Sequence, residues 1–170
     1  MKKTILAILL LIGLGNIGFA QDFTFDELVK LRSEKFPSFE TYVHDRGYNL
    51  DHLESGTRCT VFRNEDDVIS YCNFYDNGYS YRSHVGIKFE TGSREMYEKI
   101  KRSVESSLKY HKTNLRRYRH HHYIEHIYAN DDIVVHLYDI SYDNDNKPYY
   151  QIEIYSIYSG YDGCYRWERW

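Results

Sequence analysis

A β-hairpin is indicated by the stretch CTVFRNEDDVISYC, residues 59–72. Its centre, Glu65-Asp66, predicts a tight turn, because acidic and amide side chains readily bond the backbone of a turn. On either side of the turn, β-branched and aromatic residues of the kind that favour strands predominate. The turn sets Cys59 directly opposite Cys72 on two antiparallel strands.

A third strand follows the hairpin after Asn77-Gly78. This dipeptide suits a two-residue type I′ turn, which requires positive φ at both positions. Centred there, the second hairpin pairs Cys72 with Ser83 and Val68 with Ile87. The two turns together place one set of side chains on the face that we expect the helices to cover: Cys59, Val61, Val68, Cys72, Phe74, Val85, Ile87 and Phe89.

Helical patterns flank these strands. Phe25–Asp45 has apolar residues at near-helical spacing, and Thr24 with Glu27 three positions later forms a capping box. Pro37 divides the segment into two short helices, because proline is tolerated only in the first turn of a helix. A further helix is predicted over Ser93–His111, with cations at its solvated end.

The second half repeats the plan of the first. Strands are expected at about 118–128, 133–142 and 149–158, after the second predicted helix. The fold class is therefore α+β, with two helix–three-strand units that form a pseudo-repeat and an antiparallel sheet with helices packed on one face. The opposite face is expected to carry Phe62, Ile69, Tyr71, Tyr75, Tyr123, Ile127, Tyr138, Tyr155 and Ile157.

The first 20 residues have the pattern of a cleaved signal peptide. Lys2 and Lys3 precede a short apolar run, and Gly18 and Ala20 are small residues placed for cleavage before Gln21. We expect residues 21–170 to form a single domain that is periplasmic or secreted. Loss of the two lysines changes the net charge from −3 to −5. An acidic domain is not suited to nucleic acid, and no later apolar run is long enough to span a membrane.

Export also favours a disulfide on chemical grounds, because disulfides persist outside the cytoplasm. The hairpin register favours Cys59 with Cys72, since directly opposed strand positions can reach bonding distance. The chain contains three cysteines. Pairing of Cys164 with either of the other two is the alternative.

Tyrosine dominates the aromatic residues, with 19 in the chain. Tyrosine supplies a large contact area with a polar end, so a tyrosine-rich sheet face can bind a partner. We expect a non-enzymatic, inhibitor- or immunity-like protein that binds a protein in the envelope or outside the cell. No catalytic residue and no cofactor is indicated. The candidate binding residues are Tyr71, Tyr75, Tyr123, Tyr138 and Tyr155.

Histidines gather between residues 120 and 126, and an alternative function as a metal- or glycan-binding protein uses this segment. On a strand, His120, His122 and His126 share one face and are the candidate metal ligands. Glu125 and His136 share the other face, and the hairpin register sets them opposite each other. Residues 122–126 match the H-x-x-E-H pattern of zinc proteases, but that mechanism needs a helix and a downstream ligand.

The N-terminal segment contains FDELVKL at 25–31, FETYV at 39–43 and GY at 47–48. This combination resembles the opening of small exported proteins of unknown function from Bacteroidota-type bacteria. The resemblance implies a bacterial periplasmic or secreted setting and brings no catalytic residues with it.

Overall fold

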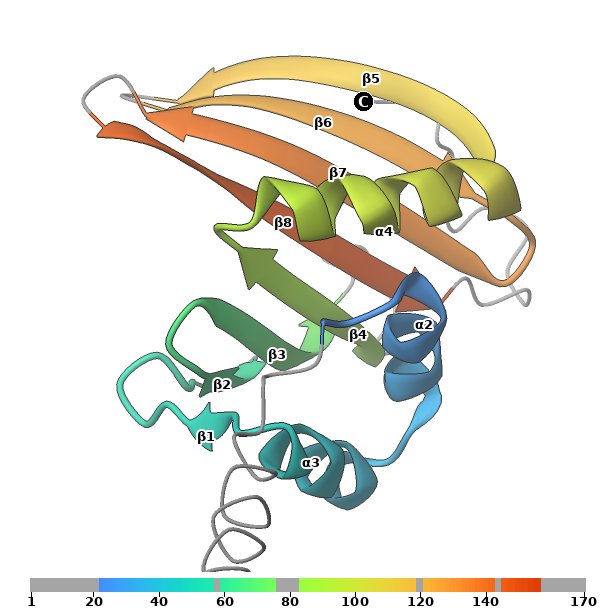
Figure 1. Ribbon diagram of the computed structural model, residues 1–170. Helices are drawn as coiled ribbons and strands as arrows, with labels where there is room; N and C mark the ends of the chain where they lie inside the picture. The colour runs from blue at the N-terminus through green and yellow to red at the C-terminus, as the bar shows by residue number, and fades with distance from the viewer. Residues whose placement is uncertain (1–21, 57–58, 76–82, 119–120, 143–144, 157–170) are drawn as a thin grey trace, which may run out of the picture.

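The computed structural model describes residues 22–56, 59–75, 83–118, 121–142 and 145–156. In these ranges three helices accompany one 8-stranded antiparallel sheet, which confirms an α+β fold (Figure 1). The helices are α2 (Phe25–Ser33), α3 (Phe36–Asp45) and α4 (Arg94–Ser107). The strands are β1 (Asn49–Leu50), β2 (Cys59–Arg63), β3 (Asp67–Tyr75), β4 (Ser83–Thr91), β5 (Lys109–Tyr118), β6 (His121–Ala129), β7 (Ile133–Tyr142) and β8 (Asp145–Ser156).

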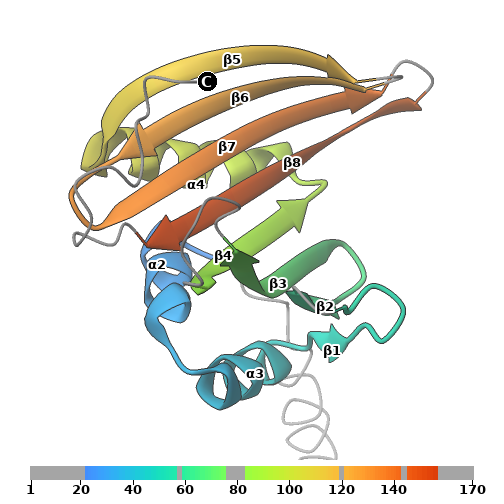
Figure 2. The same ribbon diagram turned by 180° about the vertical axis from the view of Figure 1, so that it is seen from behind.

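The strand order in the sheet is β1-β2-β3-β4-β8-β7-β6-β5. Two meanders therefore meet where β4 pairs with β8, and the chain passes through α4 to reach the far edge at β5. Strands β5 to β7 curve around α4, as Figures 1 and 2 show from opposite sides. Among the described residues, no helix has the length and apolar character needed to cross a membrane.

The helix ends follow local sequence signals. The Thr24 side chain accepts a hydrogen bond from the backbone N–H of Glu27, and the Glu27 carboxylate accepts one from the backbone N–H of Thr24, which confirms the capping box. Pro37 lies in the first turn of α3, where it separates α3 from α2 as predicted. Gly47 follows α3 with a φ of 83°, a conformation that favours glycine. The Ser93 side chain caps α4 by accepting from the N–H of Met96.

The predicted helix Ser93–His111 is too long at its C-terminal end. Helix α4 stops at Ser107, and Lys109–Tyr118 forms the edge strand β5, which pairs with β6. Val104 is the last buried residue within the helix, and Leu108, the C-cap residue, is buried in the same core but has an extended backbone. From Lys109 onward the chain pairs with β6 instead of continuing the helix. The cations that we assigned to a helix end therefore belong to a strand.

One hydrophobic core joins the helices to the sheet. The core cluster contains buried side chains of α2, α3 and α4 together with one set of strand residues, and we call the sheet face that carries this set the core face. The opposite side is called the polar face. The main strand residues of the core face are Phe62, Ile69, Ile87, Phe89, Tyr128, Ile133, Val135, Leu137, Tyr150, Ile152 and Ile154.

The predicted pairing of β3 with β4 is wrong by three residues. Cys72 pairs with Gly86 instead of Ser83, and Ser83 pairs with Tyr75. An odd shift moves every side chain of β4 to the other face, because strand side chains alternate. The shift puts Ile69 and Tyr71 on the same face as Ile87 and Phe89, so that the apolar side chains of β3 and β4 are buried together beside β8. The segment Asn77-Gly78 lies outside the described residues.

The faces of β2 and β3 are consequently the reverse of our expectation. Phe62, Ile69 and Tyr71 lie on the core face, whereas the residues that alternate with them lie on the polar face. Phe36 and Phe39 of the helices contact the rings of Phe62 and Tyr71, with centroids 5.1 to 6.3 Å apart. The side chains displaced to the polar face include Cys59, Val61, Val68 and Cys72.

The hairpin at residues 59–72 is confirmed in detail. Cys59 and Cys72 are paired and disulfide-bonded, with their Cα atoms 4.1 Å apart. Asn64 tightens the turn, since its Oδ1 accepts the N–H groups of Asp66 and Asp67 at 2.9 and 2.7 Å. Cys164 lies outside the described residues.

Candidate functional site

The polar face carries a cluster of hydrogen-bonded polar and aromatic side chains at its centre. Strands β5 to β8 contribute these side chains, and alternation along each strand turns them away from the core. We call them the polar cluster: Asn114, Glu125, His136, Tyr138, Gln151, Glu153 and Tyr155.

Glu125 is the most buried member, with 6% of its surface exposed. Its Oε1 lies 2.8 Å from Nδ1 of His136, and its Oε2 accepts a hydrogen bond from Nδ2 of Asn114 at 2.6 Å. The His136 contact lowers the pKa of Glu125 to about 2, with help from Asn114, although burial acts in the opposite direction. Glu125 is therefore an ionised carboxylate under ordinary conditions, and its two partners hold it in one orientation.

Glu153 is the second carboxylate of the cluster. It accepts hydrogen bonds from Nε2 of Gln151 at 2.6 Å, from the hydroxyl of Tyr138 at 3.3 Å and from the hydroxyl of Tyr155. Burial, together with the carboxylates of Glu153 and Glu125, raises the pKa of Tyr138 far above its ordinary value. Tyr138 therefore stays protonated and acts as a hydrogen-bond donor.

Aromatic rings surround these polar groups. His136 lies 5.4 Å from the ring of Tyr155 and 6.1 Å from the ring of Tyr138, and Tyr138 in turn lies 6.1 Å from Tyr123. Beside them is a shallow pocket of about 240 Å³. Its lining is mostly aromatic, with one amide: Tyr123, Tyr138, Ile140, Tyr149 and Gln151. The surface can thus offer both apolar contact and oriented hydrogen bonds to a ligand.

Three of the five predicted binding tyrosines share the polar face. Tyr123, Tyr138 and Tyr155 come together from β6, β7 and β8. Tyr71 does not join them, because it lies on the core face and its hydroxyl donates to the backbone oxygen of Glu34. Tyr75 pairs with Ser83 in the sheet, and its side chain is outside the described part of the structure.

The Glu125–His136 contact arises differently from our expectation. We predicted that they face each other directly, but Glu125 pairs with Tyr138 and His136 pairs with Ile127. The register differs by two residues, and an even shift leaves both side chains on the predicted face. They meet along the diagonal between neighbouring strands.

Two of the three predicted metal ligands, His122 and His126, lie on the core-face side of β6. Ile124 separates His122 from His126, and Nδ1 of His126 lies 2.8 Å from the hydroxyl of Thr113. Burial, reinforced by Lys101, lowers the pKa of His126. Across the described ranges, no group of three His, Cys, Asp or Glu side chains could hold a metal ion. His120 lies outside those ranges.

Sequence reasoning missed Asn114, Gln151 and Glu153. Gln151, Glu153 and Tyr155 alternate along β8 with buried apolar residues, which is the only local signal that relates them. Asn114 was missed because it lies between the predicted helix Ser93–His111 and the next predicted strand, in a segment to which no strand was assigned. The grouping depends on which strands are neighbours, and spacing along the chain does not contain that information.

Comparison with protein-family models, with curated proteins and with solved structures finds no match for this chain. The resemblance of the N-terminal segment to small exported bacterial proteins therefore stays a prediction.

Proposed function

We propose that this chain is an exported, non-enzymatic protein that binds another protein in the periplasm or outside the cell through the polar face of its sheet. The disulfide between Cys59 and Cys72 supports a compartment outside the cytoplasm. The signal-peptide pattern of residues 1–20 supports the same setting.

The observation that carries the proposal is the order already present in the polar cluster. Five neighbouring side chains donate hydrogen bonds to the carboxylates of Glu125 and Glu153 or lie within hydrogen-bond distance of them. Side chains that are held in place lose little conformational freedom when a partner binds, and pre-organisation of this kind favours affinity. Tyrosine is also among the residues that contribute most to protein interfaces.

The polar cluster supports binding better than catalysis. A carboxylate beside an imidazole is an arrangement used in proton transfer. Nδ1 of His136, however, contacts the carboxylate of Glu125 and the phenol hydroxyl of Tyr138, and burial raises the pKa of that hydroxyl, which disfavours its activation as a nucleophile.

A pull-down from envelope extract tests the proposal. We expect Tyr123→Ser combined with Tyr155→Ser to remove the captured partner. The matched control is Tyr110→Ser, because Tyr110 is exposed but lies on the core-face side of β5. Loss of the partner in the double variant alone supports the polar face. An unchanged set of partners in a correctly folded double variant rules it out.

Glycan binding is a second candidate, and the pocket beside Gln151 is the observation that favours it. Aromatic rings and an amide are suited to the apolar and hydroxyl faces of a sugar. A screen against immobilised glycans, repeated with Gln151→Ala, distinguishes the two candidates. Glycan signals that disappear in this variant favour the sugar, whereas signals that persist exclude this pocket.

We further propose that the sheet is a pseudo-repeat of two helix-and-meander units with the helices on one face. Two turns support this proposal. Asn130 accepts the N–H groups of Asp132 and Ile133 at 2.8 Å, as Asn64 does in the first unit. Buried residues of all three helices also belong to the same core. Hydrogen exchange tests the repeat: residues 22–91 and 94–156 should open as separate cooperative units, and a single uniform opening would contradict it.

A further inference from the structure

The two ends of the sheet have opposite chemical character. At the β1 end, the loop after the strand contains Asp51 and Glu54, and the adjacent turn contains Glu65 and Asp66, with Arg63 between them. At the other end, β5 contains Lys109, Lys112, Arg116 and Arg117 and has no acidic residue. The acidic end and the basic end are separated by the full width of the sheet.

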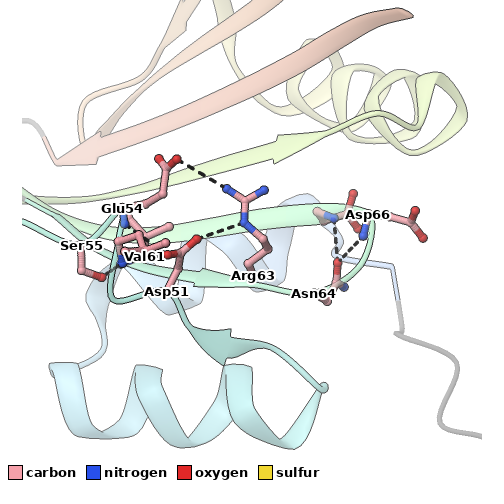
Figure 3. Close-up of polar contacts among 9 residues, drawn as sticks. Asp51, Glu54, Ser55, Val61, Arg63, Asn64 and Asp66 are labelled. Carbon is pink, nitrogen blue, oxygen red and sulfur yellow. Dashed lines mark hydrogen bonds and ion pairs between the residues drawn. The ribbon is translucent and has the colours of Figure 1, made fainter.

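The acidic end presents an apolar side chain on a well-ordered loop. Oδ1 of Asp51 accepts the N–H groups of Leu53 and Glu54 at 3.0 and 3.1 Å, and its Oδ2 accepts Nε of Arg63 at 3.1 Å (Figure 3). These bonds hold the loop against β2. Leu53 at its tip is 97% exposed. The loop therefore offers one apolar side chain that is fully accessible to a partner.

The basic end also presents exposed apolar side chains. Leu115 of β5 and Ile124 of β6 are paired and are 76% and 38% exposed. They line a groove of about 520 Å³ that also contains Arg117, His122 and Asp139. Arg117 and His122 make other contacts within the chain. Arg117 adds a positive charge and Asp139 a negative charge to the lining of the groove, and the remaining cations of β5 lie along the same edge strand.

We propose that a second copy of this chain docks here, with Leu53 of one copy in the Leu115–Ile124 groove of the next. The acidic loop then lies against the basic edge strand. Two different surfaces meet in such a contact, so the association is head-to-tail and continues into a chain or ring of copies. Charge complementarity between the ends and the pairing of an exposed leucine with an apolar groove both point to this occupant. The proposal does not depend on the function assigned to the polar face.

Sedimentation velocity over a wide range of protein concentration tests self-association. We expect the average mass to rise with concentration and to fall when salt is added, because salt screens the charged contact. Leu53→Asp and Leu115→Asp should each weaken association by roughly tenfold or more. Both side chains are largely exposed, so neither variant should unfold the monomer.

The decisive experiment mixes the two variants. Leu53→Asp retains an intact groove and Leu115→Asp retains an intact loop, so the mixture should form dimers that grow no further. Gly92→Asp is the matched control, because this exposed glycine has open space where a Cβ atom would lie and is away from both ends. It should associate like the unaltered chain. A monomeric unaltered chain, a monomeric mixture, or a single variant that still associates fully would each overturn the proposal.

Discussion

The two halves of the sheet differ in where they place their polar groups. In the first half, the polar face of β2 and β3 carries small and apolar side chains, including Val61, Val68 and the disulfide. In the second half, the same face carries the polar cluster, with Glu125 and Glu153 at its centre. One half of the continuous sheet is therefore cross-linked by a disulfide, and the other half displays oriented hydrogen-bonding groups.

The largest expected effect is loss of an aromatic core contact in the first half. Phe62→Ala should lower the free energy of unfolding by about 3–5 kcal/mol, because Phe62 is fully buried and contacts Phe36 and Phe39. Denaturant unfolding measures this change. Leu115→Ala in the second half is the contrasting variant, since Leu115 is mostly exposed and should cost less than about 0.5 kcal/mol. Equal losses would contradict the assigned core.

Removal of the disulfide should affect the first half selectively. The bond closes a sequence separation of 13 residues, so the double variant Cys59→Ala, Cys72→Ala should lose about 2–3 kcal/mol. Amide hydrogen exchange should accelerate most in β2 and β3. Acceleration that is equally strong in β6 and β7 would show that the two halves are not distinct in stability.

Acid should affect the second half. The pKa of Glu125 is lowered from its ordinary value of 4.5 to about 2, so its ionised form stabilises the folded chain above about pH 4.5. This stabilisation is lost as the pH falls towards 2. Glu125→Gln should cost about 2 kcal/mol at neutral pH and flatten that part of the stability profile.

The control for Glu125 lies on β4, in the first half. Glu90 forms an ion pair with Lys88 at 2.6 Å on the same face, but both side chains are partly exposed. Glu90→Gln should therefore cost less than about 1 kcal/mol. Chemical denaturation of both variants between pH 2 and neutrality measures their free energies of unfolding. An equal loss in the two variants would show that Glu125 stabilises the fold no more than a partly exposed ion pair does.

The smallest expected change in the free energy of unfolding concerns the asparagines of the two turns. Asn64→Ala and Asn130→Ala each remove an acceptor of two backbone N–H groups and should cost about 1 kcal/mol. Thermal unfolding of both variants measures the difference. Similar losses would support the proposed likeness of the two units, whereas a loss at only one turn would count against it.

Local features were predictable because the groups concerned are close in sequence. Thr24 and Ser93 cap the helices, Pro37 separates α2 from α3, and the turn at Glu65-Asp66 brings the disulfide together. The start of β5 was not predicted, because this basic segment has few apolar residues to indicate a strand. Its backbone N–H and C=O groups find their hydrogen-bond partners in β6. The choice between helix and strand there depends on a partner that comes later in the chain.

The amino-acid sequence by itself determined the α+β class, the hairpin of residues 59–72 and its disulfide, since turn, capping and alternation are local physical effects. Only the tertiary structure decided which face of β2 and β3 is buried. Phe62 and Ile69 share one core with Ile87, Phe89 and residues of β8, because the pairing of β3 with β4 buries apolar surface contributed by distant strands. The same long-range pairing assembled Glu125, His136 and Glu153, because strands that are distant in sequence became neighbours in the sheet.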